Sequence, residues 1–451
     1  MPWASPTSGR KYENWLGQAQ PASAPGTKWV QKPGKSFLIS NLLGRPAQSA
    51  PGEGLVGDKL NYVIVAIVVA VISVAATYYL APGKAGENAT EMENVKAGFI
   101  YVGPVADLGW TTAHDQARKI VDDKFDWLET VFIESVELDD TSAMIDRLIN
   151  EENCDIVFTT SFDFMDPTFE SAERHPDTTF FHCSGYKRAD NMGTYFSDFY
   201  QLYYLNGLMA GALTESNKLG YVGAHPIPEV VRHINAFTLG AREVNPEATV
   251  EVIWIDDWYN PTKAKEAANT LIGKGVDCLA FTEDSQTVVQ EAEAATNDGK
   301  QVYSFSHYSP MGEFGPNSCV SGQLVHWEDL YEIILQRFYT GVWVDDYDYL
   351  LAEGGVELGA EFGEAINPEF VDDLQAVEVD DPVLGEISVY DLVMKRVEQM
   401  EQTSVAFDPF TGPIYDQDDN LKFVDGERAS YMALYGSDMN WFVKGVIGSV
   451  G

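Results

Sequence analysis

From residue 95 onward the chain alternates short apolar runs with amphipathic segments, and this alternation restricts the possible folds more than any other feature. In the segment 111–125, Ala113, Ala117 and Val121 recur every four positions, as on one face of a helix. Strands that alternate with helices at this spacing pair in parallel and are covered on both faces. The runs that predict buried strands are 95–103, 130–138, 154–161, 178–185, 219–224, 249–256, 276–283 and 301–307.

The alternation is interrupted near residues 215–218 and then starts again. We therefore predict an α/β fold with two doubly wound parallel-sheet lobes. The first lobe is expected at 95–214 and the second at 215–310, while 311–451 supplies the segments that complete the lobes and the hinge. Ligands of doubly wound sheets bind beyond the carboxyl ends of the strands. Two such lobes that face each other would form a cleft from those ends.

The loops expected at these strand ends are rich in aromatic residues and carboxylates. Flat aromatic rings stack on a flat ligand, and carboxylates accept hydrogen bonds from ring N–H and amino groups, so the loops favour a purine. The same side chains would also suit a small cationic amine. Any one of them could be a packed ring or a solvated charge, and only their recurrence indicates a site. The residues are Trp110, Phe162, Phe164, Trp258, Tyr259 and Tyr308, with Asp107, Asp163, Asp166, Asp257 and Asp284.

An uncharged apolar segment precedes this alternating body. Residues 63–80 form a run of 18 residues without a charge, the shortest length that spans a bilayer, and Tyr78 and Tyr79 near its end are typical of a membrane interface. The sequence before this run is much longer than the charged start of a signal peptide. We therefore predict a transmembrane anchor at 61–82, followed by a linker at 83–94, rather than a cleaved signal or a buried helix.

Charge predicts the orientation of this anchor. Residues 1–60 carry seven basic and three acidic residues, whereas the whole chain has a net charge of −40. By the positive-inside tendency, we expect a single-pass protein of the cell membrane with a cytoplasmic N-terminus and an extracytoplasmic body. The region 1–60 is rich in Pro, Gly, Ser and Ala, which predicts a mostly disordered tail. The negative body repels phosphate, so nucleic acid is excluded as a partner.

Several segments together resemble the basic membrane protein (BMP) family of substrate-binding proteins, which serve ABC importers of purine nucleosides and nucleobases. The resemblance runs from about residue 95 to 447. It includes GFIYVGPVADLGWTTAHDQARK at 98–119, IPEVVRHINAFTLGAREVNPEA at 227–248 and FTGPIYDQDDNLKF at 410–423. It implies a type I periplasmic-binding-protein fold, a purine base or nucleoside bound in the cleft, and ABC permease subunits as partners. The family's lipobox cysteine is absent, because no cysteine precedes Cys154.

The resemblance also implies a set of ligand-binding residues on loops of both lobes. In the stretch SHYSPM, Tyr308 stands where relatives usually carry an aspartate. If that aspartate holds ribose hydroxyls, its loss favours a free base. The residues placed at the site by the resemblance, together with Tyr308, are Asp107, Trp110, Phe162, Asp166, Phe199, Gln201, Trp258 and Asp284.

Other functions are less well supported by the sequence. No G-x-S-x-G, H-E-x-x-H or P-loop motif occurs, so we expect neither an enzyme nor a cofactor. The adjacent His114 and Asp115 are interpreted as a solvated helical pair. A receptor or sensor for a purine or a small cationic amine, without transport, would have the same outline and is the main alternative. A surface-structure role also stays open.

We also predict no metal site. Asp416, Asp418, Asn420 and Glu427 have the spacing of calcium ligands in an EF-hand, but Leu421 stands where its sharp turn needs glycine, so a hairpin is expected. The cysteines form no C-x-x-C pair, which argues against a zinc or redox site. We interpret them as buried apolar residues, with a disulfide between two of them left open. They are Cys154, Cys183, Cys278 and Cys319.

Overall fold

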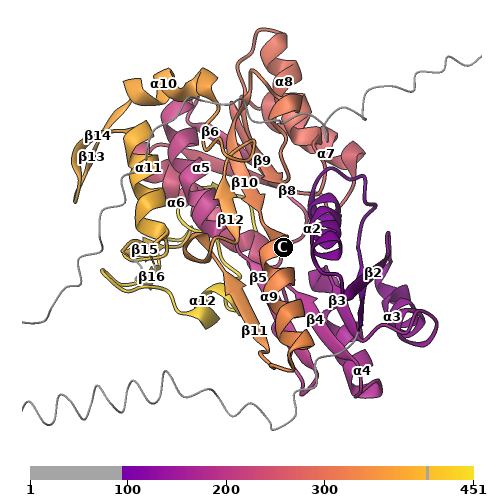
Figure 1. The fold of residues 1–451 in the computed structure, drawn as a ribbon. Coiled ribbons are helices and arrows are strands. Elements are labelled where there is room, and N and C mark those ends of the chain that lie inside the picture. The colour runs from indigo at the N-terminus through magenta and orange to yellow at the C-terminus, as the bar shows by residue number, and fades with distance from the viewer. Residues whose placement is uncertain (1–93, 403–405, 451) are drawn as a thin grey trace, which may run out of the picture. The chain divides into compact units, whose positions relative to one another are not determined.

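The computed structural model describes residues 94–402 and 406–450. The predicted tail at 1–60, the anchor at 61–82 and all but the last residue of the linker lie outside the described residues. Within the described ranges, no helix is both long and apolar enough to cross a membrane. The body is an α/β structure built on two large, mainly parallel sheets (Figure 1). The expected fold class is confirmed at this level.

The first lobe is a six-stranded parallel sheet with helices on both faces. Successive strand residues point to opposite faces, so Phe99 and Phe158 belong to one apolar cluster, whereas Ile100 and Val157 belong to another. The strands, in spatial order, are β11 (Asp346–Tyr349), β5 (Met192–Ser197), β4 (Thr179–Cys183), β3 (Ile156–Thr159), β1 (Val95–Ile100) and β2 (Leu128–Ile133); the helices are α2 (Trp110–Lys124), α3 (Thr141–Asn150), α4 (Met165–Arg174) and α9 (Trp327–Tyr339).

The second lobe is a seven-stranded sheet in which only the edge strand β12 (Val356–Leu358) is antiparallel. Its helices also cover both faces, because residues of α7 (Pro261–Gly273) and α8 (Thr287–Asn297) form a separate apolar cluster. The other strands, in spatial order, are β10 (Cys319–Val325), β9 (Tyr303–Tyr308), β8 (Cys278–Thr282), β6 (Lys218–Gly223), β7 (Thr249–Trp254) and β17 (Val446–Ile447); the helices are α5 (Tyr200–Leu213), α6 (Pro228–Val244), α7 (Pro261–Gly273) and α8 (Thr287–Asn297).

Apart from two short turns in the first lobe, the remaining elements follow residue 311 and lie around the two lobes. Asp416 accepts hydrogen bonds from the backbone N–H groups of Asp418 and Asn420, at 3.0 and 2.9 Å, so its carboxylate shapes a turn. Residues 414–415 and 421–423 pair antiparallel on either side of this turn, which confirms the expected hairpin. The elements are α10 (Val371–Ala376), β13 (Glu378–Asp381), β14 (Gly385–Ser388), α11 (Val389–Met400), β15 (Ile414–Tyr415), β16 (Leu421–Phe423) and α12 (Tyr431–Tyr435), with short 3-10 turns η1 (Leu138–Asp140), η2 (Phe162–Phe164), η3 (Gly312–Phe314), η4 (Leu351–Glu353) and η5 (Pro368–Phe370).

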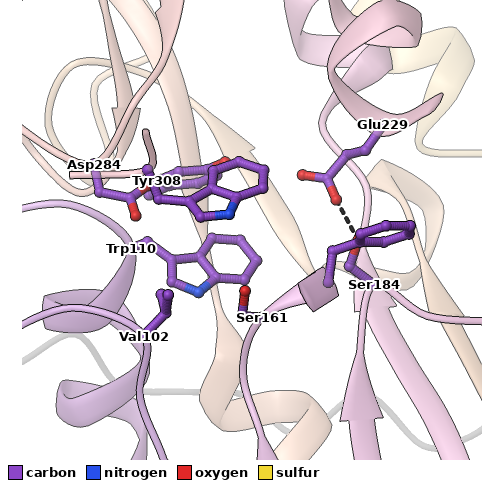
Figure 2. A pocket seen from close by; sticks show the side chains of 9 residues that line it. Val102, Trp110, Ser161, Ser184, Glu229, Asp284 and Tyr308 are labelled. Carbon is purple, nitrogen blue, oxygen red and sulfur yellow. Dashed lines mark hydrogen bonds between the residues drawn. The ribbon is translucent and has the colours of Figure 1, made fainter. Parts of the chain in front are cut away.

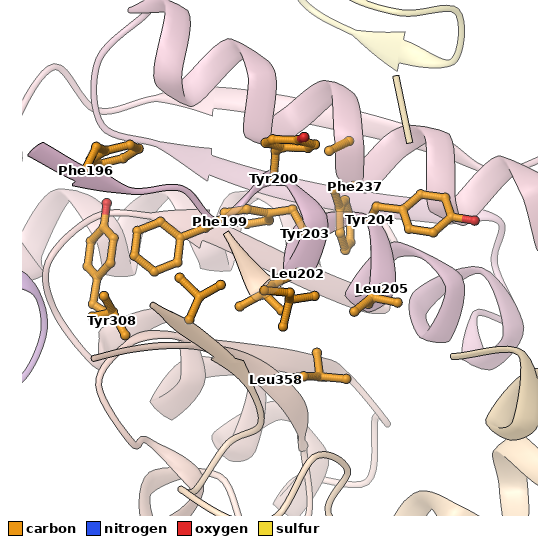
Figure 3. Packing of buried hydrophobic residues seen from close by; sticks show 14 of the residues in the cluster. Phe196, Phe199, Tyr200, Leu202, Tyr203, Tyr204, Leu205, Phe237, Tyr308 and Leu358 are labelled. Carbon is orange, nitrogen blue, oxygen red and sulfur yellow. The ribbon is translucent and has the colours of Figure 1, made fainter. Parts of the chain in front are cut away.

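The chain passes between the lobes three times, from β5 to α5, from β10 to α9 and from β11 to β12. The expected boundary at residue 214 assigns α5 to the first lobe, but α5 packs on α6 and β10 of the second. By this packing the first crossing lies at 198–199. Nearly every residue of α5 is buried, and Figure 3 shows Tyr203, Tyr204 and Leu205 within this packed core.

Glycines allow α5 and α6 to pack backbone against backbone. A Cβ atom on Gly240 would lie 2.0 Å from the carbonyl oxygen of Tyr204, and one on Gly207 would lie 2.1 Å from that of Phe237. Neither carbonyl can move without shifting a helix. The close approach therefore depends on the absence of side chains at these positions.

We expect Gly240→Ala to lower the free energy of unfolding by about 1–3 kcal/mol or more, because the methyl group forces the two helices apart. Gly273→Ala is the matched control, since nothing lies within 4 Å of a Cβ atom at that exposed end of α7. Urea unfolding of the two variants checks the difference. Equal stability of the two would show that the helices separate without cost.

The interpretation of His114 and Asp115 as a solvated pair is wrong, because both side chains are buried. The ring of His114 stacks on Trp327, with centroids 4.3 Å apart, and its Nδ1 lies 2.6 Å from the hydroxyl of Tyr331. Burial holds the pKa of His114 well below its usual value. Helix α9 returns from the second lobe to cover α2, a contact that the local sequence pattern does not reveal. All four cysteines are buried and unpaired, as one of our two interpretations expected.

Candidate ligand-binding site

A pocket of about 270 Å³, a volume that includes its opening to solvent, lies between the lobes at the carboxyl ends of their strands (Figure 2). Three residues that line it come just after β1, β3 and β4 of the first lobe, and others follow β7 and β8 or end β9 of the second. This is where doubly wound sheets bind ligands, and where we predicted the cleft. The lining residues are Val102, Trp110, Ser161, Phe162, Ser184, Glu229, Trp258, Asp284 and Tyr308.

Two indole side chains of the pocket are held in place by hydrogen bonds. Trp110, at the start of α2, donates from Nε1 to the carbonyl oxygen of Thr160 at 2.5 Å. Trp258, which follows β7, donates from Nε1 to Oδ2 of Asp163 at 2.8 Å, and this bond joins the two lobes. Rings that are fixed before binding lose little conformational freedom when a flat ligand stacks on them.

Tyr308 ends β9 in a left-handed backbone conformation, with a φ of 64°. Such a conformation costs about 1–3 kcal/mol for a residue with a side chain, and is found where the surrounding structure enforces it, often at ligand sites. The buried ring packs edge-on against Trp110, with centroids 4.7 Å apart, and against Phe199 at 5.2 Å. Tyr308 therefore forms an apolar wall where the resemblance implies an aspartate in relatives.

Two acidic side chains enter the pocket from opposite sides, as Figure 2 shows. Asp284 follows β8 and is 1% exposed, and among the described residues its carboxylate has no hydrogen-bond partner. Burial and the nearby charge of Asp107 hold its pKa well above the usual range. Glu229 lies in the first turn of α6, accepts a hydrogen bond from the Ser184 hydroxyl, and has its pKa raised to about 7 by burial. The pocket thus offers hydrogen-bonding groups at two ends of an aromatic chamber.

The pKa shifts around the pocket predict how stability depends on pH. Burial raises the pKa of Glu283 to about 8, beside Asp284. A carboxyl group with a higher pKa in the folded chain binds its proton more tightly there, so stability falls as pH rises from the unfolded to the folded pKa. His326, whose pKa is raised to about 9 by Glu328 and Glu357, acts in the same direction. The buried histidines have lowered pKa values, so they change the pH dependence of stability only below about pH 6.5.

We therefore expect the unfolding free energy of the ligand-free protein to fall between pH 7 and 8, by up to about 1.4 kcal/mol per pH unit for each such group. Urea unfolding at several pH values checks this slope. Glu283→Gln should flatten it, whereas Asp298→Asn at the exposed end of α8 should leave it unchanged. A slope that persists in full in Glu283→Gln would contradict the assignment.

Four of the nine residues that we predicted at the site do not line the pocket. Asp107 caps the start of α2, because its carboxylate accepts hydrogen bonds from the N–H groups of Gly109, Thr111 and Thr112 at 2.8–2.9 Å. Asp166 is exposed and pairs with Lys187, with Oδ1 and Nζ 2.6 Å apart. The other two, Phe199 and Gln201, are both fully buried, and Phe199 packs against Tyr308 of the pocket.

The five that do line it are Trp110, Phe162, Trp258, Asp284 and Tyr308. The remaining four residues of the pocket were not predicted from the sequence. Ser161 and Glu229 lie in loops that we expected at the cleft, but nothing distinguished them from their neighbours. Val102 and Ser184 read as parts of apolar strands. The only sequence feature that marks Glu229 is its position directly after Pro228, which opens α6.

Two larger hollows open from the same cleft and extend it on either side. One has an empty volume of about 1010 Å³ and shares Val102, Trp258 and Asp284 with the pocket. The other, of about 370 Å³, shares Phe162, Ser184 and Glu229 and reaches α12. We call this second hollow the hinge-side cavity. Both hollows therefore adjoin the aromatic pocket.

Comparison with known proteins supports this architecture. The family model described as ABC transporter substrate-binding protein PnrA-like matches residues 94–392. The putative ABC transporter glucose-binding protein TsgA13 of Haloferax volcanii is 40% identical over 293 residues, covering 65% of this chain and 73% of that protein. The purine-binding protein BAB2_0673 of Brucella abortus is 36% identical over 358 residues, covering 78% of this chain and 93% of that protein.

Solved structures show the same fold at low sequence identity. A solute-binding protein of an ABC transporter system from Aeropyrum pernix has a TM-score of 0.58 at 16% identity, covering 70% of this chain and 94% of that one. One from Conexibacter woesei has a TM-score of 0.51 at 20% identity, covering 70% and 99%. These likenesses establish a fold like that of periplasmic binding proteins.

Proposed function

Because this chain belongs to the Bmp family of PnrA-like ABC transporter substrate-binding proteins, we propose that it binds a purine nucleobase or nucleoside outside the cytoplasm and delivers it to an ABC permease. The observation that carries the proposal is the pocket between the lobes, in which Trp110, Tyr308 and other rings surround a space with Asp284 and Glu229 at its ends. Rings can stack on a purine, and carboxylates can accept hydrogen bonds from its N–H groups. The similarity to a protein named for purine binding supports the same ligand class.

The mechanism that we propose is closure of the two lobes around the ligand, without a chemical step. Three chain crossings form the hinge, and hinge closure around ligands is common in two-lobed binding proteins. Contacts across the cleft would hold the closed form: Trp258 donates to Asp163, and the Ser309 hydroxyl donates to the carbonyl oxygen of Gly109 at 2.9 Å. The closed form would then dock on the permease.

A thermal-shift screen tests the ligand class. A ligand that binds only the folded state raises the melting temperature by mass action. The panel contains adenine, guanine, hypoxanthine, the corresponding nucleosides, glucose, choline and putrescine. We expect purines to raise the melting temperature, and free bases to do so more than nucleosides, because Tyr308 supplies an apolar wall and no carboxylate for ribose hydroxyls. A shift with glucose alone would favour the activity named for the Haloferax relative.

A receptor or sensor without transport is the alternative role for the same site. Both roles need an external binding body, and they differ in the protein that recognises its closed form. Crosslinking of the full chain in its native membrane separates them. Capture of permease subunits supports import, whereas capture of a kinase or chemotaxis component supports sensing.

We also propose that the apolar run at 63–80 anchors the protein as a single-pass membrane protein with residues 1–60 in the cytoplasm. The support is sequence alone: the uncharged run and the basic tail before it. Protease added to intact cells should digest the body and spare the tail. Digestion of the tail, or recovery of the protein without the apolar run, would contradict the proposed topology.

A further inference from the structure

Glu229 occupies an unusual position for a charged side chain. It lies in the first turn of α6 in the second lobe, is only 6% exposed, and lines both the central pocket and the hinge-side cavity. Its only hydrogen-bond partner among the described residues is the hydroxyl of Ser184, which follows β4 in the first lobe. The bond therefore crosses the cleft. A buried carboxylate with one partner is costly unless a second donor reaches it.

The nearest cation does not supply that second donor. Arg232, one turn further along α6, forms an ion pair with Asp198, with Nε and Oδ2 2.8 Å apart, and donates from Nη1 to the carbonyl oxygen of Leu434 at 2.8 Å. Ser184 bonds to Oε2 of Glu229, and Figure 2 shows the other carboxylate oxygen directed into the pocket on the side of Trp110. That oxygen is free to accept a hydrogen bond from a ligand.

We propose that Glu229 is a specificity-determining residue of the cleft. One carboxylate oxygen accepts the Ser184 hydroxyl of the first lobe, and the other accepts an N–H group of the bound purine. One side chain then contributes both to recognition of the ligand and to closure of the lobes. The inference rests on the proposed function, because it assumes a purine in the pocket.

The two acids together define which purines fit best. Asp284 and Glu229 lie at opposite sides of the pocket, so a ligand that satisfies both needs hydrogen-bonding groups on two opposite edges. A free purine base has an imidazole N–H on one edge and an amino or ring N–H group on the other. A nucleoside carries its sugar on the imidazole ring and loses that N–H. The pair therefore selects the free base, in agreement with the wall that Tyr308 forms.

Other charged and titratable groups face Glu229 from every surrounding element. Arg232 and Asp198 form an ion pair, and burial holds the pKa values of Tyr203, Tyr221, Tyr308 and Tyr435 above the usual range. Burial and Asp346 raise the pKa of Asp348 to about 6, so this residue also titrates near neutral pH. The comparison of Glu229→Gln with wild type must therefore separate the titration of Glu229 from that of Asp348. The groups are Arg232 and His233 on α6, Asp198 before α5, Tyr203 on α5, Cys183 and Tyr186 around Ser184, Tyr221 on β6, Asp284 after β8, Tyr308 on β9, Asp348 on β11, and Tyr431 and Tyr435 on α12.

The test is calorimetric titration of the full-length protein and its variants with adenine between pH 5.5 and 8. We expect Glu229→Gln to weaken adenine binding about 10- to 100-fold at pH 8, the loss expected for a hydrogen bond to a charged group. Wild-type affinity should decrease as pH falls below 7, because the carboxylate that accepts the N–H becomes protonated. The variant should lack this decrease. Ser184→Ala keeps the ligand-facing oxygen and should lose less affinity than Glu229→Gln.

Glu243→Gln, the same change on α6 outside the cleft, is the control and should bind adenine like wild type. The inference is overturned if Glu229→Gln binds adenine within twofold of wild type, or if both share one pH profile. Either result leaves the proposed function intact, because wild-type binding tests that separately. Failure of the wild type to bind any purine base would overturn the proposed function and this inference together.

Discussion

Replacing Trp110 by alanine is expected to weaken purine binding about 10- to 100-fold, the largest loss that we predict for one ring. Stacking of a base on an aromatic side chain contributes about 1–3 kcal/mol. Trp110 is well placed for this role, because Nε1 is bonded to Thr160 and the ring is wedged edge-on between Tyr308 and Trp327. Its orientation is therefore set before the ligand arrives. Calorimetric titration with adenine or hypoxanthine measures the loss.

Trp110→Phe is the matched control for this experiment. It keeps an aromatic face but removes the Nε1 donor, so it should retain more affinity than alanine. Because removal of a large buried ring also destabilises the fold, the melting temperature of each variant must be measured and binding compared well below it. Unchanged affinity in folded Trp110→Ala would contradict stacking on this ring.

Asp198→Asn is expected to lower the free energy of unfolding by about 3–5 kcal/mol, because it leaves a buried guanidinium without its counter-charge. Asp198 and the Arg232 side chain are each 2% exposed, with Oδ2 and Nε 2.8 Å apart. Asp198 also lies 3.0 Å from Nε2 of His233 and sits at the first crossing between the lobes. Arg232 and His233 hold the pKa of Asp198 well below its usual range, so the carboxylate stays charged at neutral pH. Urea unfolding at pH 7 measures the loss.

The exposed ion pair of Asp419 and Lys444 provides the comparison. Its side chains are 67% and 55% exposed, and such pairs contribute about 0–1 kcal/mol. Asp419→Asn should therefore change stability little. If Asp198→Asn costs no more than this control, the pair at the crossing does not stabilise the connection between the lobes.

Much of the fold was predictable because parallel sheets leave a strong pattern. Each of the eight apolar runs from 95–103 to 301–307 overlaps an observed strand, since strands covered on both faces are apolar along their whole length. The strands β5, β10, β11, β12 and β17 of the two large sheets were not predicted. Except in the short strand β17, their sequences mix polar residues, such as Thr194 in β5 and Gln323 in β10, that are buried by tertiary contacts. The burial of His114 was not predicted for the same reason, because it depends on α9, which lies far away in the sequence.

The site was predictable at the level of loops but less so for single residues. Because ligands bind at the carboxyl ends of strands, the loops there were predicted to form the site. The structure brings four of the predicted residues together, namely Trp110, Trp258, Asp284 and Tyr308. The sequence could not decide where each side chain points. Asp107 turns back to cap its own helix, because three backbone N–H groups lie within reach. Such local competition for hydrogen bonds follows from the folded backbone and is not visible in the sequence.

The central claim is that a purine binds in the cleft between the lobes, and calorimetric titration of the purified wild-type protein tests it most directly. Adenine, hypoxanthine and guanine should each be titrated, with glucose and choline in parallel. We predict one site per chain, a dissociation constant in the micromolar range or below for at least one purine base, and a negative heat capacity change from burial of apolar surface. Absence of binding by every purine, with saturable binding of glucose or choline, would contradict the claim.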